Sequence, residues 1–193
     1  MLLYRIARGL LRAWFTVVFR MEVKGKDNVP QEGPVILCSN HISNWDPVSV
    51  GVPMHRQVHY MAKEELFRVP VLGWLIRQFG AFPVKRGGVS KESIKTTLNL
   101  LRGGKVLGIF PEGTRHAAPD GAAKRGAATF ALKTGAVVIP VALIGNYRIF
   151  QPIRVVYGLP IDLSEYAGNS SSEAIEGASE KIMKHIRDLV AKN

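Results

Sequence analysis

Residues 35–47 read VILCSNHISNWDP, a short apolar run followed by a polar loop and a proline. The four apolar residues at 35–38 predict a β-strand. Pro47 suits the first position of a helix, where its missing amide hydrogen costs nothing, and it disfavours a helical backbone for the residue before it. The stretch therefore predicts a strand that turns sharply into a helix.

The rest of the chain alternates in the same way between short apolar, β-rich runs and helical patterns. Strands are expected at 35–38, 57–61, 79–84, 105–110, 136–143 and 153–157. Helices are expected at 46–53, 70–78, 88–102, 124–134 and about 172–191. With 193 residues and no repeat or linker, the sequence predicts a single α/β domain, a mixed and largely parallel sheet flanked by helices.

The charge balance indicates anionic partners. Lys and Arg number 26 against 15 Asp and Glu, which gives a net charge of +11. Nucleic acid, anionic lipid, an acidic carrier protein or a phosphorylated substrate would each suit this charge. The sequence lacks RNP-like aromatic segments, zinc-finger spacing and RGG repeats, so we expect no nucleic-acid partner.

Cysteine and histidine usage argues against disulfide and metal chemistry. The single cysteine, Cys38, excludes an internal disulfide and fits a reducing compartment. Its place in an apolar run predicts a small buried side chain rather than a nucleophile. Four histidines lack the spacing of metal ligands and are predicted to be surface or packing residues: His55, His59, His116 and His185. We expect no metal.

Residues 1–19, MLLYRIARGLLRAWFTVVF, predict an amphipathic helix. At about 100° per residue, Arg5, Arg8 and Arg12 form one stripe. The opposite side carries Leu3, Ile6, Leu10, Trp14 and Val17. Most of the remaining positions are also apolar, which is unusual for a helix that only covers a soluble core.

Several roles can be weighed for this segment. The arginines interrupt the apolar run, which argues against a signal peptide, and a membrane-spanning helix needs about 20 largely uncharged residues. An interfacial helix, with arginines at lipid phosphates and apolar side chains at the acyl boundary, fits the stripe and the charge. A helix that packs on the core is the alternative. We expect residues 1–20 to form the interfacial helix and residues 21–193 the main domain.

His41 and Asp46 are the first candidate site. Five positions apart, they would share neither a helical face nor a strand face, so they can meet only if the chain turns between them. The residues between them and Pro47 supply such a turn. A carboxylate that orients a histidine makes a general base. The alternative is that Asp46 caps a helix while His41 is a polar loop residue, and spacing alone leaves both open.

A hydrolase would need a nucleophile on the protein, and none is credible. The nearest candidate, PVSVG at 47–51, lacks the first glycine of a nucleophile elbow. Direct activation of a substrate hydroxyl is therefore the simpler chemistry.

Two further loops carry residues that could hold a phosphate. In FPEGTR at 110–115, Gly113 permits a tight turn, Thr114 offers a hydroxyl, Arg115 can bind phosphate bidentately, and Glu112 could orient it. In GAFPVKRGG at 80–88, Arg86 stands before a predicted helix. Lys63 is a weaker candidate of the same kind. The alternative for each of them is an ordinary solvated loop.

A further segment is predicted to be structural. Residues 138–141, VIPV, indicate a buried strand whose proline ends ladder pairing.

In combination these segments resemble the glycerolipid acyltransferase superfamily, and within it the bacterial 1-acyl-sn-glycerol-3-phosphate acyltransferases. Members share a histidine and an aspartate separated by four residues, a glycine-to-arginine block, an E-G-T-R block and a later proline block. Here those blocks are His41–Asp46, Gly80–Arg86, Glu112–Arg115 and Val138–Pro140, in the same order.

The resemblance implies that His41, supported by Asp46, deprotonates the sn-2 hydroxyl of lysophosphatidate, which takes an acyl chain from acyl-CoA or acyl-carrier protein. Arg86, Arg115 and Lys63 would bind the acceptor phosphate. It implies an enzyme of phospholipid biosynthesis, without a cofactor, on the cytoplasmic face of the membrane. The alternatives are another lysolipid acceptor, or a basic membrane- or RNA-binding module without catalysis.

Overall fold

The computed structural model describes residues 2–84, 90–112, 121–169 and 171–193. Within them, a mixed sheet of seven strands has the order β1-β7-β6-β2-β5-β3-β4. The strands are β1 Glu22–Lys24, β2 Val35–Ser39, β3 Val58–Lys63, β4 Ala81–Val84, β5 Val106–Ile109, β6 Val137–Ile144 and β7 Arg154–Tyr157. The α-helices are α1 Leu2–Val18, α2 Asp46–Gly51, α3 Leu72–Gln78, α4 Lys91–Arg102, α5 Gly121–Thr134 and α6 Ser172–Ala191. Short 3-10 turns are η1 Lys26–Asn28, η2 Glu64–Arg68 and η3 Ser164–Tyr166.

The predicted α/β fold is confirmed, with one strand missed. β1 has only three residues, Glu22 and Lys24 are exposed, and its register follows β7 alone. So short an edge strand leaves no alternation to detect. The other elements differ at their ends: β3 runs on to Lys63, and α5 begins at 121 instead of 124.

The sheet is parallel where it carries the polar loops. Strands β4, β3, β5, β2 and β6 pair in parallel, while β7 pairs antiparallel to β6. Every residue of β2 is buried. Val35 and Leu37 belong to one apolar cluster, and Ile36 and Cys38 to the other, as the period of two for a strand requires. Both faces of the sheet are therefore covered.

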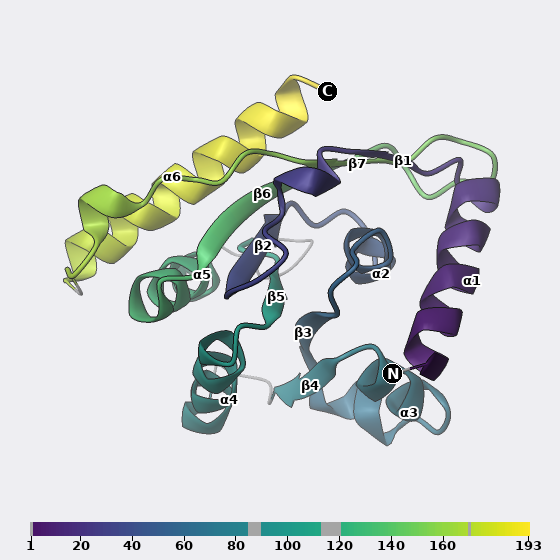
Figure 1. The fold of residues 1–193 in the computed structure, drawn as a ribbon, viewed down its shortest axis with the longest axis horizontal. Coiled ribbons are helices and arrows are strands. Elements are labelled where there is room, and N and C mark those ends of the chain that lie inside the picture. Colours follow the sequence, from purple (N-terminus) through teal and green to yellow (C-terminus); the bar gives the residue numbers. More distant parts are fainter. Residues whose placement is uncertain (1, 85–89, 113–120, 170) are drawn as a thin grey trace.

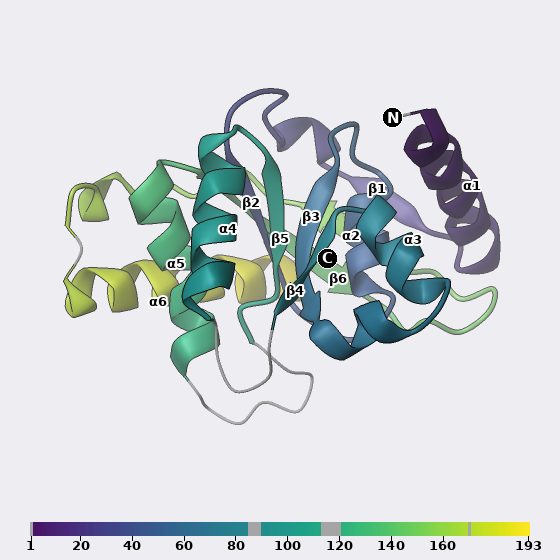
Figure 2. The ribbon, with the colours of Figure 1, turned by 90° about the horizontal axis from the view of Figure 1, so that it is seen from below.

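Figure 1 shows the two covering layers, with α1, α2 and α3 on one side of the sheet and α4, α5 and α6 on the other. Figure 2, turned by 90°, keeps α5 and α6 at one end of the molecule and α1 and α3 at the other. The α6 helix begins at an N-cap, Ser171, whose side chain accepts from the amide of Ala174 at 3.2 Å.

Helix α1 is both a core helix and an exposed one. Phe15 is fully buried and Leu11 and Val18 pack against the same core cluster. Its other apolar side remains in solvent, with exposed fractions of 51% for Ile6, 68% for Leu10, 42% for Trp14 and 66% for Val17. The Arg8 guanidinium, on the packed side, donates to the carbonyl of Met54. A helix that is apolar nearly all round can thus pack with one face and leave a second apolar face open.

The expectation for Pro140 was half right. The regular β6–β7 ladder covers only Val141–Ile144, although the amide of Gly158 still donates to the carbonyl of Pro140 at 2.8 Å. The β2–β6 ladder passes through Pro140, which lies opposite Cys38. The missing amide hydrogen of a proline interrupts pairing on one side of a strand only. β6 continues past Pro140 to Ile144 and so carries the chain towards the carboxyl end of β2.

Candidate active site

The candidate residues follow strands that end at one edge of the sheet. Because β2, β3, β4 and β5 are parallel, their carboxyl ends meet there, and such edges are where α/β proteins place their sites. His41 lies two residues beyond β2, Lys63 is the last residue of β3, and Glu112 lies three residues beyond β5. Lys63 is exposed and Glu112 is half-buried.

The structure brings His41 and Asp46 into direct contact. Nδ1 of His41 lies 2.6 Å from Oδ2 of Asp46, with the carboxylate fully buried and the imidazole 18% exposed. The turn between β2 and α2 creates this contact, as the spacing required. Nε2 of His41 has no hydrogen-bond partner among the described residues. The imidazole is therefore oriented through one nitrogen and available through the other, the arrangement of a general base.

The Asp46 carboxylate accepts hydrogen bonds from the loop between β2 and α2 and does not cap the helix. Its Oδ2 also accepts the amides of Ile42 at 2.6 Å and Ser43 at 2.7 Å. Asp46 is the first residue of α2, and the N-cap position falls on Trp45, which makes no side-chain cap. The alternative in which Asp46 caps the helix is wrong: Asp46 lies inside α2, and its two oxygens accept bonds from the loop and from Tyr147.

Tyr147 holds the second oxygen of Asp46 and was missed from sequence. Its hydroxyl donates to Oδ1 of Asp46 at 2.8 Å and lies 2.9 Å from Oγ of Ser49 in α2. Burial and then the charge of Asp46 raise the pKa of Tyr147, so the phenol remains a donor. It comes from the loop after β6, 101 residues away, and no motif marks it. Its aromatic ring packs edge-on against Phe19, at 5.5 Å between centroids.

Asn40 fixes the start of the loop and was also missed. Its side-chain amide donates to the carbonyl of Leu143 at 2.9 Å, and its side-chain oxygen accepts the amide of Leu143 at 2.8 Å. The pair extends the β2–β6 ladder by one side chain, which sets the direction in which the chain leaves β2 towards His41.

A row of three rings supports the imidazole. Phe110 stacks on His41 at 4.4 Å between centroids and 24° between planes, and Tyr60 lies 6.2 Å behind Phe110, inclined by 13°. The Tyr60 ring crosses β5 at Gly108, where an added Cβ would lie 2.1 Å from a ring carbon. Glycine is required there because any side chain would displace the ring. Phe110 thus joins the 110–115 segment to the His41 loop.

The remaining predicted site residues lie outside the described residues: Arg86, Gly113, Thr114 and Arg115. The segments that contain them start at the sheet edge, after Val84 of β4 and after Glu112.

The cysteine and two of the histidines have structural roles. Cys38 is buried, and burial raises the pKa of its thiol, as expected for a packing residue. Nδ1 of His59 lies 3.1 Å from the carbonyl of Gly80, and Nδ1 of His185 lies 2.8 Å from that of Lys181. Among the described residues, no group of three Cys, His, Asp or Glu side chains could hold a metal ion.

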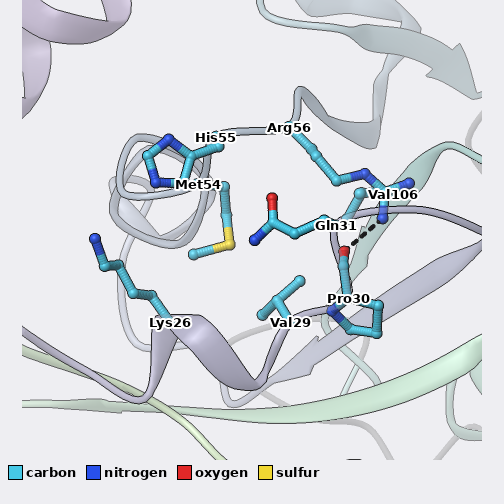
Figure 3. A pocket seen from close by; sticks show the side chains of 8 residues that line it. All are labelled: Lys26, Val29, Pro30, Gln31, Met54, His55, Arg56 and Val106. Atoms are coloured by element: carbon cyan, nitrogen blue, oxygen red, sulfur yellow. Dashed lines mark hydrogen bonds between the residues drawn. The ribbon is translucent and has the colours of Figure 1, made fainter.

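A small cavity at the opposite edge of the sheet is structural. It measures about 10 Å³, room for about one water molecule, and Lys26, Met54 and Val106 are among its lining residues (Figure 3). At its side, Arg56 donates to the carbonyls of Pro30 at 2.8 Å and Gly33 at 2.6 Å. This arginine holds loops together and is not an anion site.

Comparison with known proteins identifies the family of this chain. The model of the acyltransferase family matches residues 20–144, which include β2, the His41 loop, β5 and β6. The chain belongs to the acyltransferase family.

Similar proteins point to one activity within this family, and their similarity covers nearly the whole chain. The 1-acyl-sn-glycerol-3-phosphate acyltransferase of Bacillus subtilis is 32% identical over 97% of this chain and 96% of its own length. The enzyme of the same name from Streptococcus pneumoniae is 31% identical over 96% of this chain and 72% of its own length. The crystal structure of the 1-acyl-sn-glycerophosphate acyltransferase from Thermotoga maritima superposes with a TM-score of 0.71 at 26% identity, covering 96% of this chain and 79% of that one.

Proposed function

We propose that His41 is the general base of this enzyme, a 1-acyl-sn-glycerol-3-phosphate acyltransferase that forms phosphatidate. Nε2 of His41 takes the proton of the sn-2 hydroxyl as the oxygen attacks the carbonyl carbon of an acyl thioester. The tetrahedral intermediate collapses, the carbon–sulfur bond breaks, and the imidazolium returns the proton to the leaving thiolate. The products are phosphatidate and the free thiol of CoA or acyl-carrier protein.

The observation that carries this proposal is the 2.6 Å contact between His41 Nδ1 and a fully buried Asp46 carboxylate. The contact selects the tautomer with its lone pair on Nε2, and the nearby negative charge stabilises the imidazolium that forms during transfer. Because Tyr147 and two loop amides hold the carboxylate, it is fixed before the substrate arrives.

Binding of the acceptor phosphate is assigned to Arg86 and Arg115, with Lys63 as a third cation. The support is topological: Lys63, and the described residues before the two arginine segments, lie at the edge that also carries His41. Gly113 and Thr114 would offer an amide and a hydroxyl to the same phosphate, and Glu112 would orient Arg115. A guanidinium can bind phosphate through two parallel hydrogen bonds.

The decisive assay incubates the purified protein with lysophosphatidate and either labelled acyl-CoA or labelled acyl-carrier protein. Labelled phosphatidate with at least one donor is expected, and its dependence on His41 tests the proposed role. A panel of lysolipids with other head groups should be poorer acceptors. Equal rates on a phosphate-free lysolipid would contradict the phosphate-binding assignment.

Replacing Tyr147 with phenylalanine should weaken catalysis without changing acceptor binding. The change leaves Oδ1 of Asp46 buried without its donor, which costs about 1–3 kcal/mol of stability and loosens the imidazole. We expect kcat to fall about tenfold, with KM for lysophosphatidate unchanged. Tyr157 is the matched control, because its buried hydroxyl donates to the carbonyl of Val50 and not to Asp46. Tyr157→Phe should lower stability but leave kcat intact; equal kcat losses would assign both tyrosines to the fold.

Helix α1 is the proposed membrane anchor, at the cytoplasmic face of the cell membrane. In the part of the chain that the structure describes, no helix has both the length and the apolar character that crossing a bilayer requires. The exposed stripe of Ile6, Leu10, Trp14 and Val17 suits insertion at the interface instead. Trp14 contacts Trp45, in the loop between β2 and α2, at 5.7 Å between ring centroids, so the exposed stripe continues to the residue beside Asp46.

Substituting Leu10 and Val17 together with asparagine should abolish most vesicle binding. Deleting residues 1–20 would be a poorer test, since Phe15 and Phe19 are buried in the core. The two exposed side chains contribute apolar area to the bilayer, and we expect partition to fall by roughly 10- to 100-fold. Flotation with vesicles of phosphatidylcholine and phosphatidylglycerol measures it. Undiminished flotation would refute the anchor.

A further inference from the structure

Two turns hold apolar side chains in solvent at the cost of backbone strain. Val71, between η2 and α3, is 78% exposed, and Phe150, between β6 and β7, is 67% exposed. Both have a positive φ, of 63° and 62°, and at Val71 a ψ of −55° makes this a rare and strained γ-turn. Branched and bulky side chains rarely adopt this conformation. Strain of this kind persists where the surrounding structure enforces it and is concentrated at functional sites.

The surroundings enforce the Val71 turn. The amide of Leu72 donates to the carbonyl of Pro70 at 2.6 Å, and the amide of Gly73 donates to that of Val69 at 2.8 Å. An added Cβ on Gly73 would lie 2.4 Å from the carbonyl oxygen of Phe67, so glycine lets α3 pack directly on η2. Further large apolar side chains are exposed around the turn: Leu66, Val69, Leu72, Trp74 and Leu75.

Helix α3, which the Val71 turn precedes, and the Phe150 turn lie at opposite ends of α1. Tyr4, in the first turn of α1, contacts Phe79, the residue after α3, at 5.6 Å between ring centroids. At the other end, the amide of Phe150 donates to the carbonyl of Val18 at 2.7 Å. Figures 1 and 2 both place α3 and the loop between β6 and β7 at the same end of the molecule as α1. Helix α1, with its exposed stripe, therefore runs from α3 to the Phe150 turn.

The charge of these segments selects the kind of partner. Residues 1–21, 66–80 and 141–153 contain seven arginines and no acidic residue, and one of these arginines, Arg68, forms an ion pair at 3.1 Å with Glu64 just outside the second range. Exposed arginines accompany each apolar element: Arg5, Arg12, Arg68, Arg77 and Arg148. Apolar side chains ringed by arginines match a bilayer with anionic head groups. A second copy of this chain would instead bring arginines against arginines.

We infer that the Val71 turn and the Phe150 turn are two further membrane-contacting elements, which together with α1 seat the protein on an anionic bilayer at three places. The inference rests on the proposed membrane association of α1. Three contacts fix an orientation that a single helix leaves free to rotate about its axis. The seated surface includes Trp45, in contact with Trp14, and so keeps the His41 loop beside the lipid surface from which the acceptor comes.

The test replaces Val71 and Phe150, singly and together, with asparagine, which is polar and is found at positive φ more often than valine or phenylalanine. Binding of the full-length proteins to vesicles of phosphatidylcholine and phosphatidylglycerol is measured by flotation. Each single change should weaken partition roughly fivefold, and the pair more than tenfold. Turnover of a short-chain, monomeric lysophosphatidate should be unchanged.

Leu159→Asn is the matched control. Leu159 is 72% exposed but follows Gly158, which lies against Leu189 of α6, on the far layer from α1. It should bind vesicles like the unaltered protein. Normal binding by the Val71 and Phe150 variants, with loss only in the Leu10 and Val17 variant, would overturn this inference and leave the α1 anchor standing. Equal binding to pure phosphatidylcholine, or conversion of a dimer to a monomer by either change, would also overturn it.

Discussion

Replacing His41 with alanine is expected to lower the rate of phosphatidate formation by about 10³- to 10⁴-fold, the usual contribution of a general base. An unassisted hydroxyl is a weak nucleophile at neutral pH, and the imidazole held by Asp46 is the only base proposed for it. Steady-state assays with saturating donor and acceptor measure the effect. KM for lysophosphatidate should change little, since the phosphate is assigned to other residues.

The control for this variant is His185→Ala. His185 also uses Nδ1 for a fixed hydrogen bond, to the carbonyl of Lys181, but it lies on α6 in the other layer. It should retain full activity. His41→Ala loses its stacking on Phe110, and such a pair contributes about 0.5–1.5 kcal/mol. A small drop in Tm is therefore expected. More than a tenth of the original rate in a folded His41→Ala protein would show that another group is the base.

The sheet was largely visible in the sequence because its strands are buried. A strand covered on both faces, such as β2, is a continuous apolar run, and each run of this type was found. β1 escaped because two of its three residues are exposed at the edge. The alternation of strands and helices along the chain then indicated the α/β class. In that class the residues that follow parallel strands, here His41, Lys63 and Glu112, lie together at the carboxyl ends of those strands.

The catalytic loop could be predicted only in part. The separation of His41 and Asp46 required a turn, and the turn is present. What the spacing could not give was the set of donors around the carboxylate. Tyr147 reaches Asp46 from 101 residues away, and one tyrosine in a loop carries no periodic or spacing signal. Asn40, beside His41 in sequence, would have needed the partner strand β6 to be known.

Helix α1 shows a second limit of sequence patterns. A helical projection separates arginines from apolar residues, but it does not say which apolar side meets the protein. Phe15 and Leu11 pack in the core, whereas Leu10 and Val17 remain exposed. The two alternatives weighed from the sequence were a core-packing helix and an interfacial helix. Each describes one side of α1, because a nearly all-apolar helix can pack one side on the core and leave apolar side chains exposed on the other.

Asp46→Asn should separate the charge of Asp46 from its geometry. The structure favours survival of the fold: the side-chain oxygen can keep the bonds from His41, Ile42 and Ser43. The new amide would then face Tyr147, whose hydroxyl can accept it and donate to Ser49 instead. We expect Tm to fall by only about 2–4 °C, equivalent to about 1 kcal/mol. The rate should nevertheless fall about 10²- to 10⁴-fold, because no carboxylate remains to stabilise the imidazolium.

Comparison with Asp46→Ala makes the result decisive. In the alanine variant, two loop amides, His41 and Tyr147 lose their acceptor at a fully buried position. We therefore expect the free energy of unfolding to fall by about 3–5 kcal/mol and the loop to become disordered. If Asp46 acted only as a scaffold, the asparagine variant would keep both its Tm and most of its rate, and only the alanine variant would fail. If the charge acts on His41, the asparagine variant is folded and slow, and its double mutant with His41→Ala is no slower than His41→Ala alone. That non-additivity would assign the two residues to one catalytic unit, with Asp46 acting through the imidazole.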